Sequence, residues 1–495
     1  MTIHTPAAAF RSPAMPGATP VTVASGDGIG PEIMNAALQM MLAAGARLAV
    51  EPIVIGETAY RGGHGSGIPP EAWDSIRRTG LLFKAPITTP QGGGYKSLNV
   101  TLRKSLGLFA NTRPCLSYAP FVTTRHPVMD VVIIRENEED LYAGIEHRQT
   151  DEVVQCLKLV SRPGCEKIVR YAFDYARANG RRKVTCFTKD NIMKMTDGLF
   201  RKVFDEVAAD YPGIGSDHMI IDIGAARLAA RPEEFDVVVT LNLYGDILSD
   251  IAAEISGSVG LGGSSNIGEH GAMFEAVHGS APQIAGQGIA NPSGLLLSGI
   301  MMLVHVGQRE VAERLHLAWL KTIEDGIHTP DIFREGVSAR RVGTQAFADA
   351  VIDRLGQAPR TLPRPDYAAA TAIVPFTPPR RPAADKRLVG IDVFVHAAGT
   401  SPEVLAARMQ AAASGMLALT MVSNRGVKVW PEGQPQTFLT DHWRCRFEMP
   451  APRQFTKAMV AELLAGLARA GIDFVKTEHL FTFDGVPGYS LGQGQ

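Results

Sequence analysis

Residues 92–114, GGGYKSLNVTLRKSLGLFANTRP, are the first stretch with the residue types of a binding site. Apolar residues recur there at three- and four-residue steps, which predicts a short helix with one buried face. Ser97, Asn99 and Arg103 lie off that face. Ser97 stands at the helix start, where free N–H groups favour an anion. These side chains predict a surface that holds carboxylates; a solvated helix with Ser97 as its N-cap is the alternative.

Two further groups of polar residues follow apolar, strand-like runs. Arg135 ends the run VVIIR and Tyr142 comes shortly after it, while Lys189 and Asn191 follow the run ending CFT. Ligands bind at strand ends in α/β sheets, so these residues are candidates for one site. A tyrosine and a lysine there would supply the proton donor and acceptor of a redox reaction. A surface lysine is the alternative for Lys189.

Carboxylates suited to a hard metal ion occur in two places. Asp246 and Asp250 are four residues apart in NLYGDILSDIAAEISGSVG, on one face of a helix, and Asp222 ends the apolar run MIID. Three such carboxylates predict a Mg²⁺ or Mn²⁺ site, although helix capping alone would also explain Asp246.

The glycine- and proline-rich loop around His278 suits close approach to a nucleotide, and a purely structural loop would look similar.

The elements that position these residues alternate between strand and helix. We expect strands at residues 81–83, 131–134, 184–187, 219–221 and 237–240, and helices at 166–178 and 195–209, which predicts an α/β fold. The chain has 495 residues, 45% of them hydrophobic, and can bury a large core. A net charge of −1 gives no electrostatic case for nucleic acid, and no run reaches membrane-spanning length. Five scattered cysteines favour a reducing cytoplasm.

A separate domain is expected at the C-terminal end. Residues 358–387 contain many prolines and predict an extended linker. Residues 388–495 show the order βαββαβ, the ferredoxin-like α+β arrangement. Asp441 and His442 are adjacent on a strand and point to opposite faces, so we interpret them as a solvated pair rather than a site.

Over about residues 20–357 the chain resembles the isocitrate and isopropylmalate dehydrogenase family of metal-dependent β-decarboxylating dehydrogenases, and NLYGDILSDIAAEISGSVG matches the family signature nearly throughout. The resemblance implies a two-domain α/β fold and a homodimer with a shared active site. It implies a large coenzyme-binding domain at 20–108 and 262–357 and a small domain with a dimer clasp at 109–261. Residues 1–19 are rich in Ala and Pro, which predicts a disordered tail. A similar C-terminal extension, with VSNRG and DHWR, occurs in long bacterial members.

The resemblance also assigns roles to residues. Ser97, Asn99, Arg103, Arg113 and Arg135 would bind the substrate, Tyr142 and Lys189 would be the acid–base pair, and Asp222, Asp246 and Asp250 would hold the metal. Lys189 and Asp222 would come from the partner subunit. The Ser-x-Asn pattern of Ser97 and Asn99 resembles that of the isocitrate-using members. This resemblance implies oxidative decarboxylation of isocitrate to 2-oxoglutarate and CO₂ in the tricarboxylic acid cycle. Homoisocitrate, isopropylmalate or tartrate as substrate, or a non-catalytic regulatory subunit, remain alternatives.

Coenzyme choice is expected to depend on two residues of the HGSAP loop. NADP-using relatives typically have Lys-Tyr where this chain has Gln283 and Ile284, and Pro330 stands where they have a further tyrosine, although Arg334 is retained. A phosphate that loses cationic partners binds more weakly, so we predict NAD, with NADP as the alternative. The residues assigned to the coenzyme are Thr89, Asn191, Glu275, His278, Gly279, Gln283, Ile284 and Asn291.

Overall fold

The structure, a computed structural model, describes residues 17–89, 97–367, 373–413, 417–449 and 455–492. Most of the tail predicted at 1–19, and residues 368–372 of the predicted linker, lie outside these ranges. The chain divides into two compact units. The first contains Met1–Ala143 and Lys158–Pro378, and the second contains Gly144–Leu157 and Pro379–Gln495.

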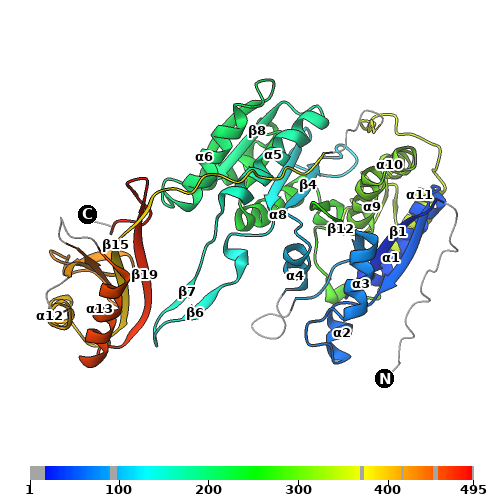
Figure 1. Cartoon of the computed structure of the whole chain (residues 1–495). Helices are drawn as coiled ribbons and strands as arrows, with labels where there is room; N and C mark the ends of the chain where they lie inside the picture. The colour runs from blue at the N-terminus through cyan, green and yellow to red at the C-terminus, as the bar shows by residue number, and fades with distance from the viewer. Residues whose placement is uncertain (1–16, 90–96, 368–372, 414–416, 450–454, 493–495) are drawn as a thin grey trace. The chain divides into compact units, whose positions relative to one another are not determined.

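A ten-stranded mixed sheet runs through the first unit (Figure 1). Strand β11 is antiparallel to both β12 and β4, and β4 is antiparallel to β5, while the other neighbours are parallel. In spatial order the strands are β2 (Leu48–Ile53), β1 (Thr19–Ala24), β3 (Leu81–Lys84), β12 (Ala272–Ala276), β11 (Gly263–Ile267), β4 (Ala110–Leu116), β5 (Asp130–Glu136), β10 (Val237–Thr240), β8 (Lys183–Thr188) and β9 (Gly215–Ile220).

Helices pack on this sheet in two groups. Those near β1, β3 and β12 are α1 (Gly30–Ala43), α2 (Glu57–Arg61), α3 (Pro70–Thr79), α9 (Ser293–His305), α10 (Arg309–Glu324) and α11 (Thr344–Ile352). Those near β5, β8 and β10 are α5 (Arg162–Ala178), α6 (Thr196–Ala208), α7 (Ile221–Ala230) and α8 (Asn242–Ser256). The short strands β13 (Ile327–His328) and β14 (Arg340–Arg341) pair separately in parallel. None of the helices in the described part of the chain combines the length and apolar run needed to cross a bilayer.

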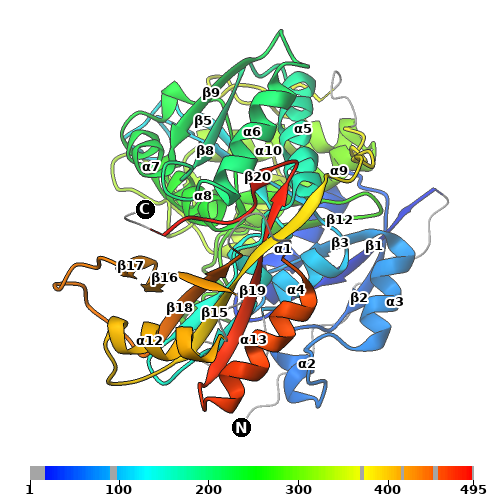
Figure 2. The same cartoon turned by 60° about the vertical axis from the view of Figure 1, so that its left-hand side comes forward.

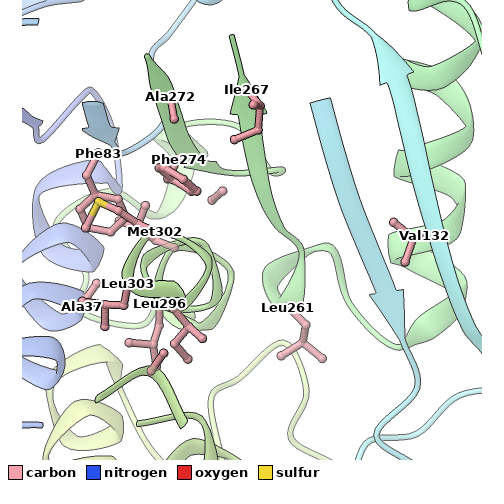
Figure 3. Packing of buried hydrophobic residues seen from close by; sticks show 14 of the residues in the cluster. Ala37, Phe83, Val132, Leu261, Ile267, Ala272, Phe274, Leu296, Met302 and Leu303 are labelled. Carbon is pink, nitrogen blue, oxygen red and sulfur yellow. The ribbon is translucent and has the colours of Figure 1, made fainter. Parts of the chain in front are cut away.

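Helix α9 lies at the centre of the largest core. Its sequence SGLLLSGIMMLVH is apolar almost all round, as expected for a helix buried on every side. Figure 3 shows Leu296, Met302 and Leu303 of this helix among Phe83 and Phe274 of the sheet. Gly299 allows α1 to approach closely, because a Cβ at that position would come within 2.7 Å of the Met41 sulfur.

The predicted strands and helices of this unit are confirmed, with one local difference. Strand β9 ends at Ile220 and α7 begins at Ile221. Asp222 therefore lies in the first turn of a helix rather than at the end of a strand, because the apolar run MIID spans the junction between the two elements.

The second unit contains a six-stranded sheet with helices α12 (Pro402–Ala412) and α13 (Lys457–Arg469) on one face (Figure 2). The inner order β16-β18-β15-β19 is that of the predicted ferredoxin-like fold, and all neighbours are antiparallel. Strands β17 and β20 extend the two edges. The six strands are β15 (Lys386–His396), β16 (Ala418–Asn424), β17 (Val427–Trp430), β18 (His442–Glu448), β19 (Phe474–Phe483) and β20 (Val486–Pro487).

A hairpin of β6 (Glu146–Arg148) and β7 (Val154–Cys156) belongs to the same unit. Asp441 holds it, because its carboxylate accepts hydrogen bonds from the Thr150 hydroxyl at 2.5 Å and from the Asp151 backbone N–H at 3.1 Å. Asp441 and His442 are both buried. The prediction of a solvated pair was therefore wrong: a single strand pattern does not show that another segment, almost three hundred residues earlier, covers it.

Candidate active site

Helix α4 (Leu98–Ser105) presents the polar face that the sequence predicted. Leu98 and Leu102 are buried on the other side. The Ser97 side chain makes no capping hydrogen bond, and its hydroxyl accepts one from Thr89 at 3.4 Å instead. Among the described residues, the buried Oδ1 of Asn99 and Nε of Arg103 have no hydrogen-bond partner. Buried polar atoms of this kind normally have a partner, so this face is suited to a polar ligand.

Three arginines are buried close to one another. Arg103 donates to Glu275 at 2.8 Å, and Arg113 of β4 donates from Nη1 to the Ser249 hydroxyl at 2.6 Å. Arg135, at the end of β5 and 1% exposed, donates from Nε and Nη2 to Asn242 Oδ1 at 3.0 and 2.8 Å. Burial, followed by Arg113 and Arg103, lowers the pKa of Arg135 to about 10. Cations crowded in this way favour binding of an anion.

Gly245 permits the close packing of α8 on Arg135. A Cβ at position 245 would lie 2.6 Å from Cγ of Arg135, which no ordinary contact allows. The glycine of the NLYGD segment is thus explained by the position of the arginine side chain. The helix also supplies Asn242 and Ser249, which orient two of the arginines.

Asp246 and Asp250 lie on the same face of α8, as predicted. Arg113 is 3.5 Å from a carboxylate oxygen of each, Arg135 forms an ion pair with Asp246, and the Tyr142 hydroxyl donates to Asp246. Burial alone would raise the pKa of Asp246, but Arg135 and Arg113 outweigh it and lower the pKa. Burial raises the pKa of the Tyr142 phenol, so it stays protonated as a potential acid.

Lys189 and Asp222 form a separate pair. The Lys189 ammonium donates to Asp222 Oδ1 at 2.9 Å, and this hydrogen bond lowers the pKa of the exposed Asp222 carboxyl. The Lys189 backbone N–H donates to the buried Asp197 at 2.7 Å. Across the described residues, no hydrogen bond or ion pair connects this pair to Asp246 or Asp250. In the described part of the chain, the oxygens of Asp222, Asp246 and Asp250 do not all lie within 4.8 Å of one another, so a single chain does not bring the three predicted metal ligands together.

The residues predicted for the coenzyme differ widely in their surroundings. Thr89, Asn191, Gly279 and Gln283 are exposed, and Ile284 is half-buried. His278 has a buried Nε2 with no partner among the described residues, whereas its Nδ1 lies 3.1 Å from the Gly279 carbonyl. Asn291 bonds Asp331 and the backbone N–H of Ser293, and Glu275 is buried with Arg103. Their contact with a coenzyme stays a prediction.

Lys84 is the residue that the sequence analysis missed. It ends β3, is fully buried, and forms an ion pair with Glu275. Burial lowers the pKa of Lys84, and Glu275 opposes this effect. The signal was available, because Lys84 follows the apolar run LLF and stands at a strand end, as Arg135 does.

The chain matches known proteins over nearly its whole length. The isocitrate/isopropylmalate dehydrogenase family profile matches residues 20–351, and the profile of the C-terminal domain of bacterial isocitrate dehydrogenase matches residues 386–495. A Rickettsia felis protein named isocitrate dehydrogenase [NADP] is 55% identical over 96% of this chain and 99% of its own length. A Thermus thermophilus protein of the same name is 42% identical over 96% of both chains. A crystal structure of a Thermus thermophilus protein superposes with a TM-score of 0.91 at 41% identity, covering 97% of each chain.

The names of these relatives correct one prediction. The preference for NAD inferred from Gln283 and Ile284 is wrong, because the relatives that match nearly the full length are named for NADP. The inference weighed the missing cations at the HGSAP loop against Arg334 alone and left out Arg340 and Arg341, which are also exposed. The profile match over most of the chain, together with full-length relatives far above 30% identity, shows that the protein belongs to the isocitrate/isopropylmalate dehydrogenase family.

Proposed function

We propose that the protein is an isocitrate dehydrogenase that oxidises and decarboxylates isocitrate to 2-oxoglutarate with NADP. The observation that carries the proposal is the meeting of three buried arginines with the polar face of α4, where Asn99 and Arg103 keep unpartnered atoms. Isocitrate carries a third carboxylate that needs such donors, and an isopropyl group in its place would leave them unpaired. The names of the full-length relatives support the same substrate.

Charge balance in the arginine cluster supports a substrate with three negative charges. The buried cations outnumber the neighbouring carboxylates by one. A divalent cation held by the aspartates would raise this excess to three, the charge of isocitrate near neutral pH. The groups concerned are Lys84, Arg103, Arg113 and Arg135 as cations, with Glu275, Asp246 and Asp250 as anions.

The residues act in two steps. Hydride leaves C2 of isocitrate for the nicotinamide while the proton of the C2 hydroxyl passes to Lys189 of the partner subunit, which accepts it as the neutral amine and becomes an ammonium. The resulting ketone is β to the C3 carboxylate, so the bond from C3 to that carboxylate breaks, CO₂ leaves, and the electron pair forms an enolate. Tyr142, with its raised pKa, donates the proton to C3. Asp246, Asp250 and Asp222 of the partner subunit would hold a Mg²⁺ or Mn²⁺ ion, which would supply Lewis-acid stabilisation of the negative charge that develops in both steps.

Two chains are needed because the Lys189–Asp222 pair makes no contact with the Asp246 cluster among the described residues. Mixing tests this directly. Lys189→Met and Tyr142→Phe are each expected to keep no more than about 1% of wild-type activity, and dimers re-formed from an equal mixture should regain about a quarter of it, since half of the dimers carry one intact site. Mixing two preparations of Lys189→Met is the control. A mixture that stays inactive would place all the catalytic residues in one chain.

The substrate and the coenzyme are tested by turnover. The purified protein with Mg²⁺ or Mn²⁺ should reduce NADP in the presence of isocitrate, and kcat/KM should be higher with NADP than with NAD. We propose that Arg334 contacts the 2′-phosphate: Arg334→Gln should lower kcat/KM for NADP by about tenfold and leave that for NAD unchanged, while Arg309→Gln is the matched control. Turnover of isopropylmalate, homoisocitrate or tartrate in place of isocitrate would overturn the proposal.

A further inference from the structure

The second unit contains a cavity of about 260 Å³ that the proposed reaction does not use. The β6–β7 hairpin closes one side through Val153 and Gln155, and strands β15, β16 and β18 supply the other walls. The side chains important here are Phe394, Ser423, Arg425, Thr440, His442 and Arg444. They combine one flat apolar wall with hydroxyl groups and cations.

His442 has an unmet hydrogen bond at this cavity. The residue is only 8% exposed, and its buried Nε2 has no partner among the described residues. The imidazole stacks on Phe394, with ring centroids 5.5 Å apart and planes inclined by 21°. A buried ring nitrogen without a partner destabilises the fold unless a bound molecule or water completes it. Together the two rings form a surface for a planar group.

The charged groups around the cavity are predominantly positive. Arg444 donates from Nε to the Ser423 hydroxyl at 3.0 Å, and the Lys476 ammonium lies 5.0 Å from the centre of the Phe394 ring. Arg425 is exposed at the rim. Asp392 is 3.8 Å from Arg444, but Arg446 already occupies both of its oxygens at 2.8 and 2.9 Å.

The remaining acidic groups nearby are also paired. Glu478 forms an ion pair with Lys476 at 2.6 Å, and Asp441 is taken up by the hairpin. Arg425 donates from Nε to the Phe438 carbonyl at 3.3 Å, as Arg444 does to Ser423, and among the described residues no hydrogen bond occupies the terminal nitrogens of either guanidinium. These nitrogens can bind an anion.

We propose that this cavity binds a small planar organic anion, an aromatic or heteroaromatic carboxylate, with its ring against Phe394 and His442 and its carboxylate facing Arg425 and Arg444. An uncharged aromatic ligand would leave the two arginines without a counter-charge. An anion without a ring would leave the apolar wall exposed to water. The site lies within the second unit and does not depend on the residues proposed for catalysis.

Ligand-observed fluorine NMR on the full-length protein tests the proposal. The probe is 4-fluorobenzoate, and 4-fluorobenzamide is its uncharged match. We expect the benzoate to bind at least about fivefold more tightly than the benzamide, and saturating isocitrate with Mg²⁺ to leave its binding unchanged. Loss of binding on adding isocitrate would show that the probe occupies the carboxylate site of the dehydrogenase, and would overturn the proposal.

Variants assign the binding to the cavity. Arg425→Gln and Arg444→Gln should each weaken 4-fluorobenzoate binding by about fivefold or more, whereas Arg469→Gln, an exposed arginine at the end of α13, should not change it. The Arg425 variant changes an exposed side chain, so it keeps the test valid if the Arg444 variant fails to fold. Equal binding by wild type, Arg425→Gln and Arg469→Gln, or no binding by the wild type, would refute the site.

Discussion

Replacing Glu275 by glutamine should destabilise the protein strongly while preserving its shape. Glu275 is 3% exposed, forms an ion pair with the fully buried Lys84, accepts a hydrogen bond from Arg103 at 2.8 Å, and accepts another from Asn266 at 3.0 Å. Burial would raise the pKa of Glu275, but Lys84 and Arg103 outweigh it and hold the pKa far below its usual range. The carboxylate is therefore charged, and the glutamine variant leaves the buried Lys84 and Arg103 without their counter-charge.

The magnitude follows from the burial of Lys84. Lys84 is 0% exposed to solvent, so removing the counter-charge should cost about 3 to 5 kcal/mol in the free energy of unfolding. Adding Lys84→Met to Glu275→Gln removes the stranded lysine charge, and the double variant should recover at least about 2 kcal/mol relative to the single one. Urea unfolding followed by circular dichroism at pH 7.5 measures both values.

Kinetics of the same variant separate two roles for Glu275. Arg103 loses its orienting partner, so KM for isocitrate should rise while KM for NADP stays within about twofold. A rise confined to the coenzyme KM would instead support the coenzyme contact predicted from the sequence. The argument from buried charge is refuted if Glu275→Gln loses less than about 1 kcal/mol, or if the double variant is as unstable as the single one.

Three other changes have definite expected results. Asn99→Leu should lower kcat/KM for isocitrate by about a hundredfold with the urea midpoint unchanged, because Asn99 Oδ1 is unpartnered; equal loss of stability would make the residue structural. Tyr142→Phe should lower kcat by about a hundredfold with KM for isocitrate within about threefold, and an unchanged kcat would exclude it as the acid. Burial lowers the pKa of His316 to about 4 from 6.5, so this neutral imidazole contributes stability that is complete above pH 6.5 and is lost as the pH falls towards 4. The loss is up to about 3 kcal/mol. His316→Phe should make the urea unfolding midpoint depend less on pH between pH 7 and 4.5, and a pH dependence equal to that of the wild type would contradict this prediction.

The fold was largely predictable because its elements carry clear periodicity. Val237–Thr240 and Val131–Ile134 are short apolar runs bounded by polar residues, and both are central strands. Strands at the edges were less visible. Strand β17 follows β16 after a tight turn in which Arg425 has a φ of 50°, and the sequence there lacks the usual Asn-Gly or Gly-Gly signal.

The residues of the candidate site also include some that could be predicted from the sequence and some that could not. Arg103 could be predicted because it lies off the apolar face of its helix, and Arg135 because it ends the apolar run VVIIR; Arg113 was assigned from the family resemblance. All three are buried in the structure. Coenzyme choice was predicted wrongly, because the cations that bind a phosphate can come from any segment near it. The sequence of one loop does not show which cations the other segments supply. The burial of Asp441 was unpredictable for a related reason: its partners Thr150 and Asp151 are distant in sequence, and local pattern contains no information about such contacts.

That contact bears on how the protein is made. The hairpin at residues 144–157 leaves the ribosome early, but the carboxylate that accepts the Thr150 hydrogen bond lies 291 residues further along the chain. At about 5 to 20 residues per second, the hairpin waits about 15 to 60 seconds for its partner during synthesis. The hairpin is a two-stranded sheet whose outer edges pair with no other strand among the described residues, and the exposed, charged sequence EHR of β6 protects one of these edges against pairing with another chain. The charge on this edge therefore protects the hairpin both while it waits for its partner and in the folded protein.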